Sequence, residues 1–353
     1  MSSGELAWVG HRSPAASYAT TLHATRGGLS STGVDVLIVT ALQGEFEAAR
    51  EAGLAQGVAS WQGCDLATSA PYLLGRCTTA DGACFVVALA RPTRMGSIGT
   101  APLVSMLVER LKPQCVAMSG VCAGNPENVA LGDVIVAELT YAYDQERDHR
   151  QFPLADRWVR EAQELSASDL ASYGEVSPAD ARLWLLERLL AREDPTKHPA
   201  RRRYFPGETW ADCVRSLVDD GLVVRDGARL SLTGHGRQHI EQVVCDDVHG
   251  PSRLPFQIAV GPMASGNVVV KDGVTWEQLK QRGVRTVLGL EMEAATVACA
   301  AFCAEVPYWV VVKGVMDHAD PRKDDRYKSF AARASAEVLF KLLERGLRRP
   351  VPA

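Results

Sequence analysis

The chain has 353 residues, of which 46% are hydrophobic and 23% charged, and this composition is typical of a globular protein with one large domain or two average ones. Its formal net charge of −4 gives no overall basis for binding nucleic acid or an anionic membrane. No apolar run approaches the ~20 residues that span a bilayer. Nine cysteines without a CxxC pair or a zinc-site spacing fit a reducing cytoplasm.

Residues 1–33 differ in composition from the rest of the chain. They are rich in Ser, Ala, Gly and Thr and show neither a helical nor a strand period. They also lack the continuous apolar segment that a secretory signal needs. We interpret them as an N-terminal tail or docking arm.

Short apolar runs begin at Val34 and alternate with amphipathic segments. VDVLIVTAL, ACFVVALA, CVAMSG and GDVIVAELTY are typical of buried strands, whereas QGEFEAAREAGL and GTAPLVSMLVERLKP have helical spacing. The alternation resumes after residue 250 with FQIAVGPMASG, PYWVVVKGVMDHAD and a last helix, SFAARASAEVLFKLLERGL. This order predicts an α/β domain around a largely parallel central sheet.

The segment between these two parts has a different pattern. PADARLWLLERLLA and GETWADCVRSLVDDG have helical spacing, LVVRDGARLSLT indicates two strands joined at Asp226-Gly227, and GHGRQHIEQVV returns to helix. Helix, helix, hairpin and helix is the order of a winged helix, and SLVDDGLVVRDGARLSLTGHGRQHI resembles winged-helix domains. We therefore predict an α/β domain in two parts, 34–177 and 250–348, with a winged-helix-like insert at 178–249 and a short tail at 349–353.

The charge of the insert bears on its partner. Between residues 178 and 240 there are 11 Lys and Arg against 9 Asp and Glu, a net of +2. DNA-binding modules are usually more basic than this, and the cluster Arg201-Arg-Arg203 is also typical of a solvated loop. We expect the insert to bind a protein or sense a signal, with DNA as the less favoured alternative.

Polar residues follow several of the predicted strands, where open α/β sheets bind their ligands. Glu45 follows the first strand, Ser119 and Gly120 end the third, and Asp317 ends WVVVKGVMD. Small residues let a ligand or another chain segment approach the backbone closely. Each position also has a structural explanation, because a lone Glu is commonly solvated and an Asp after a strand commonly belongs to a turn.

The stretch LEMEAA, residues 290–295, places Glu291 and Glu293 in an otherwise apolar run. Lying two residues apart, the two carboxylates do not share a helix face, and Met292 lies between them. Burying an unpaired carboxylate is costly. The position of these two carboxylates therefore needs an explanation.

The order and spacing of these stretches resemble the superfamily of purine nucleoside phosphorylases and methylthioadenosine/S-adenosylhomocysteine nucleosidases. The resemblance covers roughly residues 34–172 and 250–348 and rests on LEMEA, on KGVMDHAD followed by YKSFAARASAEV, and on SGVCAGNPENVALGDVIVA. It implies a three-layer α/β/α sandwich around a mixed sheet. The tail and the winged-helix-like insert lie outside it.

The resemblance implies roles for single residues. Glu293 would bind the ribose hydroxyls through charge-assisted hydrogen bonds, Met292 would lie against the sugar, and Glu291 would support them. Asp317 would protonate N7 of the purine as the glycosidic bond breaks, and Glu45 would be the general base on an attacking water. The implied mechanism is dissociative, because water captures an oxocarbenium-like ribose.

Other positions carry over as substrate contacts. The segment ASGNVVV resembles the strand that flanks the purine, and Ser119 and Gly120 would border the ligand. Lys313 stands where a nucleosidase has an active-site arginine, so a cation is retained. The implied substrate contacts are therefore Glu291, Met292, Glu293, Ser119, Gly120, Val268, Val269, Val270, Arg94 and Lys313.

Hydrolysis is favoured over phosphorolysis. A phosphorylase needs a Gly-rich loop and arginines around its dianionic nucleophile, whereas the opening loop ALQGE has one Gly, no Arg and the Glu expected of hydrolases. Arg91 and Arg94 keep the alternative open, since they could bind phosphate, meet the 5′ phosphates of a nucleotide together with His149, or be solvated. Val121 and Met316 stand where nucleosidases have serines, which suits a divergent branch of the family.

We therefore predict an N-glycosidase that cleaves a purine nucleoside or nucleotide, with adenine the favoured base, and that needs no metal or cofactor. The divergent branch includes domains fused to signalling or defence modules, so nucleotide depletion in antiviral defence is an expected role. The alternatives are a phosphorolytic nucleoside phosphorylase and a non-catalytic purine sensor acting through the insert. The family implies a homo-oligomer, and the expected location is the cytoplasm. We expect no membrane partner, and nucleic acid is the less favoured partner.

Overall fold

The computed structural model describes residues 33–65, 67–80, 82–144, 150–247, 250–267, 275–281, 286–321 and 325–347. The predicted tail or docking arm at 1–33 lies outside these residues except for Gly33, and so does the tail at 349–353. None of the described helices is long and apolar enough to cross a membrane.

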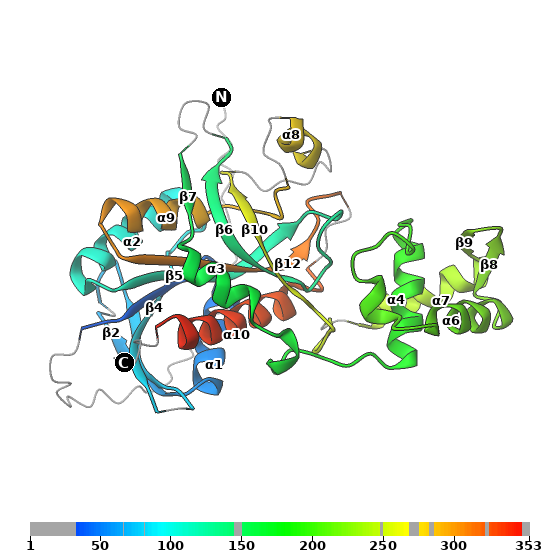
Figure 1. The fold of residues 1–353 in the computed structure, drawn as a ribbon, viewed down its shortest axis with the longest axis horizontal. Helices are drawn as coiled ribbons and strands as arrows, with labels where there is room; N and C mark the ends of the chain where they lie inside the picture. The colour runs from blue at the N-terminus through cyan, green and yellow to red at the C-terminus, as the bar shows by residue number, and fades with distance from the viewer. Residues whose placement is uncertain are drawn as a thin grey trace, which may run out of the picture. The chain divides into compact units, whose positions relative to one another are not determined.

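Alternating strands and helices form the first part of the core (Figure 1). The elements are β1 (Val36–Val39), α1 (Gln43–Ala55), β2 (Val58–Cys64), β3 (Tyr72–Thr78), β4 (Cys84–Ala90), α2 (Ser97–Leu111), β5 (Cys115–Gly124), β6 (Val134–Ala142), β7 (Gln151–Pro153), α3 (Asp156–Gln163) and a 3₁₀ turn (Ala167–Asp169). The predicted strands and helices of this part are present. The pair β2 and β3 was not predicted.

The second part of the core returns to the same sheet. Its elements are β10 (Ile258–Ser265), α8 (Thr275–Gln281), β11 (Gly289–Glu291), α9 (Ala294–Cys303), β12 (Tyr308–Asp317) and α10 (Lys328–Gly346). The apolar run around LEMEAA is therefore divided between a short strand, which ends at Glu291, and a helix, for which Glu293 is the N-cap residue.

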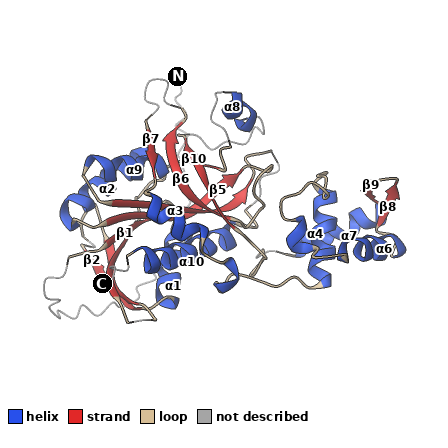
Figure 2. Cartoon of the chain, in the orientation of Figure 1, coloured by secondary structure: helices blue, strands red, loops and turns tan. Residues whose placement is uncertain are grey.

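The strands form one mixed sheet in the order β11-β10-β6-β12-β5-β1-β4-β3-β2, with β7 beside β6. Pairing is parallel at the centre, along β4, β1, β5 and β12, and antiparallel at β2–β3–β4 and between β6 and β12. Figure 2 shows the strands between helices on both faces. Helices α1, α3 and α10 cover one face with one apolar core, and α2 and α9 cover the other with a second core. The predicted α/β/α sandwich is confirmed.

Strand β11 determines where the carboxylates of LEMEAA lie. It pairs in parallel with β10 and in antiparallel with the end of β5, so that Leu290 lies opposite Ala123. Ala123 is also the partner of Asp317 at the end of β12. The stretch LEMEAA and Asp317, although distant in sequence, are thereby brought to one edge of the sheet.

The segment 178–249 forms a helical unit with one hairpin. Its elements are α4 (Pro178–Leu190), α5 (Arg201–Tyr204), α6 (Thr209–Asp219), β8 (Val223–Asp226), β9 (Arg229–Leu232) and α7 (Gly234–Asp246). Asp226 pairs with Arg229 across a two-residue loop, in which Gly227 has a φ of 57°, a conformation that favours glycine. A separate apolar core includes Trp184, Leu217 and Ile240. The winged-helix assignment stays a prediction.

The chain leaves the core and returns to it at neighbouring positions. The Gly174 N–H donates to the Leu254 carbonyl (3.0 Å), and the Leu254 N–H donates to the Ser172 carbonyl (3.2 Å). Arg203 of α5 pairs with Asp133, whose buried carboxylate also accepts the N–H groups of Ala130 and Gln257. Two adjacent connections and an ion pair therefore attach the insert to the core.

Candidate active site

A cavity of about 290 Å³ lies at the edge of the sheet where β5, β11 and β12 end. The first turn of α1, the loop before α2 and the start of α10 complete its walls. It is lined by Ala41, Leu42, Glu45, Met95, Val121, Cys122, Ala123, Tyr143, Leu290, Glu291, Met292, Glu293, Met316, Asp317, Asp325 and Lys328. The cavity thus joins all three of the acidic residues that the sequence singled out for catalysis and ribose binding, Glu45, Glu293 and Asp317.

Glu45 is held in the cavity wall by backbone N–H groups. Its Oε2 accepts the N–H groups of Ala41 and Leu42, and its Oε1 accepts that of Val121, each at 2.8 Å. Because the first N–H groups of a helix have no partner within the helix, a first-turn carboxylate is favourable there. Glu45 is only 3% exposed, so these bonds fix its carboxylate with one edge towards the cavity.

Gly120 provides the space that the Glu45 carboxylate needs. A Cβ atom at residue 120 would lie 2.5 Å from Oε1 of Glu45. The sequence indicated that the backbone here approaches either a ligand or another chain segment. The structure supports the second alternative for Gly120, which does not line the cavity.

Glu291 stabilises the start of α9. Its carboxylate accepts the N–H groups of Glu293 (2.8 Å) and Ala294 (2.9 Å) and the hydroxyl of Ser265. Its Oε2 lies 3.3 Å from the ammonium Nζ of Lys313. Glu291 is therefore largely occupied by bonds within the protein and orients the backbone on which Met292 and Glu293 are placed.

Glu293 has fewer partners than Glu291. Its Oε1 accepts the Gly96 N–H at 2.7 Å, and its Oε2 lies 3.7 Å from Nζ of Lys313. Gly96 has a φ of 91°, which only glycine adopts easily. Burial raises the pKa of Glu293 to about 7, and the neighbouring Glu291 carboxylate adds to this effect against the opposing charge of Lys313. Glu293 thus has more capacity than Glu291 to accept hydrogen bonds from a ligand.

Lys313 lies behind the two glutamates, inside the sheet. It is 1% exposed and does not line the cavity itself. Burial opposes its charge, but the carboxylates of Glu291, Glu293 and Glu45 outweigh that effect and keep the pKa of Lys313 above its ordinary value. The cation therefore compensates the charge of the acidic wall from a buried position behind it.

Asp317 lies at the end of β12 with its side chain in the cavity wall. It is 5% exposed, and its Oδ1 accepts the Ala319 N–H at 2.8 Å. The next residue, His318, is also buried, and its Nδ1 lies 2.7 Å from the Gly124 carbonyl oxygen. These bonds fix the turn after β12 and hence the direction of the Asp317 carboxyl.

The remaining predicted contacts lie in different places. Met292 lines the cavity, whereas Ser119 is buried outside it, and Arg94 is exposed next to the cavity-lining Met95. Val268, Val269 and Val270 lie outside the described residues, and so does His149.

The structure adds cavity residues that the sequence did not indicate. Met95, Tyr143, Asp325 and Lys328 come from loops and from the start of α10. The Lys328 ammonium lies 3.6 Å from the Asp325 carboxylate. Among the described residues that line the cavity, Lys328 is the one cationic side chain. Asp325 and Lys328 do not follow an apolar strand, so no local pattern in the sequence distinguished these two residues from surface charges.

Comparison with known proteins identifies the family. The sequence model of the phosphorylase superfamily matches residues 35–348. The chain belongs to the phosphorylase superfamily. The resemblance seen in the sequence is thereby confirmed, and the match also extends across the insert.

Two relatives are similar over much of this chain. ATP nucleosidase Cap17 from Escherichia coli is 24% identical over 311 residues, which are 88% of this chain and 51% of that protein. An uncharacterized protein, y4jS, from Sinorhizobium fredii is 25% identical over 265 residues, 72% of this chain and 49% of that one. This chain therefore spans about half the length of the curated relatives that it matches.

Solved structures share the fold. The 5′-methylthioadenosine/S-adenosylhomocysteine nucleosidase of Neisseria meningitidis, in complex with methylthio-immucillin-A, has a TM-score of 0.52 at 16% identity, covering 88% of this chain and 98% of that one. The S-adenosylhomocysteine nucleosidase of Streptococcus pyogenes, in complex with 5-methylthiotubericidin, has a TM-score of 0.53 at 18% identity, covering 89% and 98%. At these identities the similarity shows the fold alone.

Proposed function

We propose that this protein is an N-glycosidase that hydrolyses the base–ribose bond of a purine nucleoside or nucleotide. The observation that carries the proposal is that Glu45, Glu293 and Asp317, from three distant segments, line one cavity. Backbone N–H groups and Lys313 offset the cost of burying these three carboxylates. Their convergence on one cavity supports a shared catalytic role.

Each carboxylate suits a different step. Glu293 accepts hydrogen bonds from the ribose hydroxyls, because its contacts with Gly96 and Lys313 leave acceptor capacity. Asp317 serves as the general acid that transfers a proton to N7 of the purine and makes the base a better leaving group. Glu45 takes a proton from the water that attacks C1′, and its backbone bonds hold it in position for this. Met292 packs against the sugar, and Glu291 positions it.

The charge of the cavity favours water over phosphate as the nucleophile. Among the described residues, the lining includes five carboxyl groups and one cation, Lys328. The negative charge of these carboxylates would repel a phosphate dianion, whereas a neutral water molecule can be activated by one carboxylate acting as a base. Phosphorolysis is therefore the less favoured alternative.

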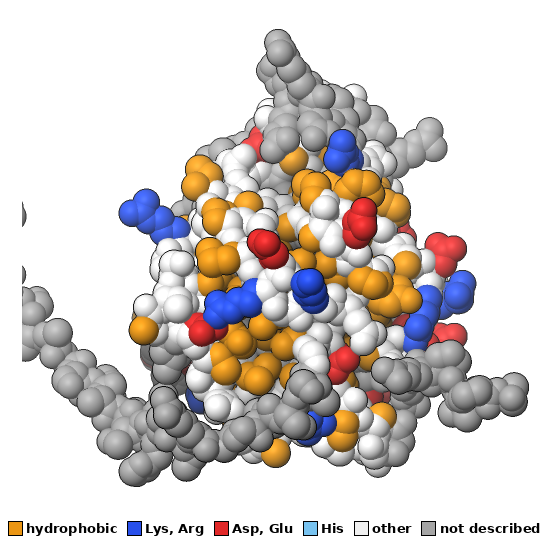
Figure 3. Space-filling model, turned by 90° about the vertical axis from the view of Figure 1, so that its left-hand side faces the viewer, with side chains coloured by type: hydrophobic (Ala, Val, Ile, Leu, Met, Phe, Trp, Pro, Cys, Tyr) orange, Lys and Arg blue, Asp and Glu red, His pale blue; other side chains and the backbone are white. Residues whose placement is uncertain are grey.

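Adenine nucleotides are the proposed substrate class. The support is the similarity to a protein named ATP nucleosidase. Arg94, which is exposed and precedes the cavity-lining Met95 in the chain, is the proposed contact for 5′ phosphates. An enzyme that cleaves adenine nucleotides would deplete them, so we also propose a role as a nucleotide-depleting defence effector. Figure 3 shows apolar side chains on the face that carries α2 and α9, where Ile98 and Phe302 are 89% and 62% exposed. Exposed apolar side chains on this face support the proposal of a homo-oligomer.

The test is a product assay on the full chain. Adenosine, methylthioadenosine, AMP, ATP and NAD are each incubated with and without phosphate, and free base is measured by mass spectrometry. Hydrolysis in H₂¹⁸O places the label on C1 of the ribose, whereas phosphorolysis yields ribose 1-phosphate. If no condition releases base, but a purine raises the melting temperature, the non-catalytic sensor is correct instead.

A further inference from the structure

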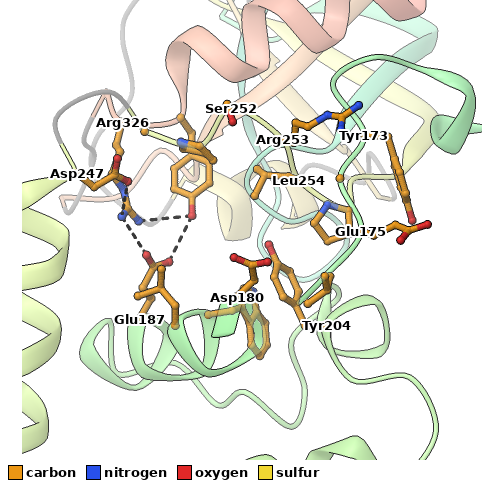
Figure 4. A pocket seen from close by; sticks show the side chains of 18 of the residues that line it. Tyr173, Glu175, Asp180, Glu187, Tyr204, Asp247, Ser252, Arg253, Leu254 and Arg326 are labelled. Carbon is orange, nitrogen blue, oxygen red and sulfur yellow. Dashed lines mark hydrogen bonds and ion pairs between the residues drawn. The ribbon is translucent and has the colours of Figure 1, made fainter. Parts of the chain in front are cut away.

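The insert holds the core through a buried polar contact. Glu187 of α4 accepts a hydrogen bond from Nη1 of Arg326 (2.9 Å) and lies 3.4 Å from the hydroxyl of Tyr327. Arg326 also lies 3.5 Å from Asp247, and Figure 4 shows its side chain beside both carboxylates. We call these four residues, Glu187, Asp247, Arg326 and Tyr327, the clasp. The clasp also lines a groove of about 750 Å³ between the insert and the core.

The clasp is more than a surface ion pair. Glu187 and Tyr327 are 9% and 8% exposed, and the Arg326 side chain is 14% exposed. Exposed ion pairs contribute little to stability. Charge-assisted bonds away from water are stronger. Removing the Glu187 carboxylate takes a buried counter-charge at 2.9 Å from Arg326, whose contact with Asp247 is longer, at 3.5 Å. The clasp therefore fixes the position of the two core residues that it binds.

The residues on either side of Arg326 and Tyr327 line the candidate active site. Asp325 precedes them and Lys328 follows them, and both belong to the cavity wall. Tyr327 is the N-cap residue of α10, so its position sets where that helix begins. Any displacement of the clasp would therefore move Asp325 and Lys328 as well.

A second path leads from the clasp to Asp317. A hollow of about 260 Å³ is lined by Glu187, Arg326 and Tyr327 on one side and by Met316 and Asp317 on the other. Met316 and Asp317 also line the active-site cavity. Glu187 of the insert helix α4 and the proposed catalytic acid, Asp317, thus line the same hollow.

We propose that Glu187 is a positioning residue for the active site: through Arg326 and Tyr327 it fixes the wall formed by Asp325 and Lys328. The inference rests on the proposed function, because the wall formed by Asp325 and Lys328 matters for activity only if the cavity binds a substrate. The insert then completes the substrate-binding cavity and is not an independent module joined to an enzyme.

Steady-state kinetics of full-chain variants test the proposal. Glu187→Gln keeps the shape of the side chain and removes its charge, Glu187→Asp keeps the charge, and Glu241→Gln is the matched control. Glu241 lies on α7 of the insert, 57% exposed and 4.0 Å from Arg237, so its change removes an ion pair without touching the core. We expect Glu187→Gln to raise KM about tenfold with kcat nearly unchanged, because binding contacts are misplaced.

Glu187→Asp should recover most of this loss, and Glu241→Gln should match the wild type. The proposal is wrong if Glu187→Gln has wild-type kinetics, if Glu241→Gln is equally impaired, or if only kcat falls. Hydrogen exchange separates this proposal from the proposed function. Even in a protein without activity, the amides at the start of α10 should exchange faster in Glu187→Gln and not in Glu241→Gln; equal exchange would overturn the positioning role.

Discussion

Replacing Glu293 with Gln tests whether this buried carboxylate lowers the stability of the fold and is nevertheless required for activity. Gln has nearly the same shape and is neutral at every pH. In the wild type, the folded state raises the pKa of Glu293 from 4.5 to about 7. Between these two values the folded protein binds a proton that the unfolded chain has released, so the free energy of unfolding falls as the pH rises.

The magnitude follows from the pKa shift. A change from 4.5 to about 7 corresponds to on the order of 3 kcal/mol between the two ends of the range, with burial as the main cause. The stability contribution is fully present below pH 4.5 and is lost as the pH rises through about 7. Near pH 6 the slope approaches ~1.4 kcal/mol per pH unit, because one proton is involved.

Urea unfolding of the wild type and of Glu293→Gln at pH 5, 6, 7 and 8 measures this difference. The free energy of unfolding of the wild type minus that of the variant should fall by ~3 kcal/mol over the series. The variant should also lose base release. The reasoning is refuted if the difference in free energy of unfolding between the two proteins stays constant with pH. It is also refuted if the variant becomes less stable relative to the wild type as the pH rises.

Three other variants have distinct expected results. Asp317→Asn should lower kcat by about 10²- to 10⁴-fold and keep thermal stabilisation by a purine ligand, because only the acid is lost. Gly120→Ala should displace the Glu45 carboxylate, since the new Cβ would lie 2.5 Å from it, and lower kcat by about 10²-fold with modest destabilisation in thermal melts. Lys313→Met should destabilise the fold by about 3–5 kcal/mol in urea, because it leaves buried carboxylates without their cation.

The sequence predicted strands best where both faces of the sheet are buried. Continuous apolar runs predicted the central strands β1, β4, β5 and β12, and the Asp226-Gly227 pair predicted the hairpin of the insert. Strands β2 and β3 were missed because they form the antiparallel edge of the sheet and are partly exposed, so their residues show no clean period.

The candidate site was only partly predictable, because it is made by approaches between distant segments. Glu45, Glu293 and Asp317 could be selected through motif order. For Gly120 the sequence left open a ligand or another chain segment, and only the fold shows the Glu45 carboxylate in the space beside it. Lys328 and Asp325 resemble ordinary surface charges in sequence, and only the fold places them in the cavity wall. No pattern within either segment could have paired Glu187 with Arg326.

The carboxyl of Glu293 sets opposite pH dependences for folding and for binding. Only the ionised form can accept hydrogen bonds from two ribose hydroxyls through both of its oxygens. Because its pKa is about 7 in the folded protein, the binding-competent fraction falls as the pH drops, and affinity should weaken about tenfold per pH unit below 7. Over the same range the free energy of unfolding rises. A site that bound its ligand equally well at pH 5 and pH 8 would therefore require a different residue to hold the sugar.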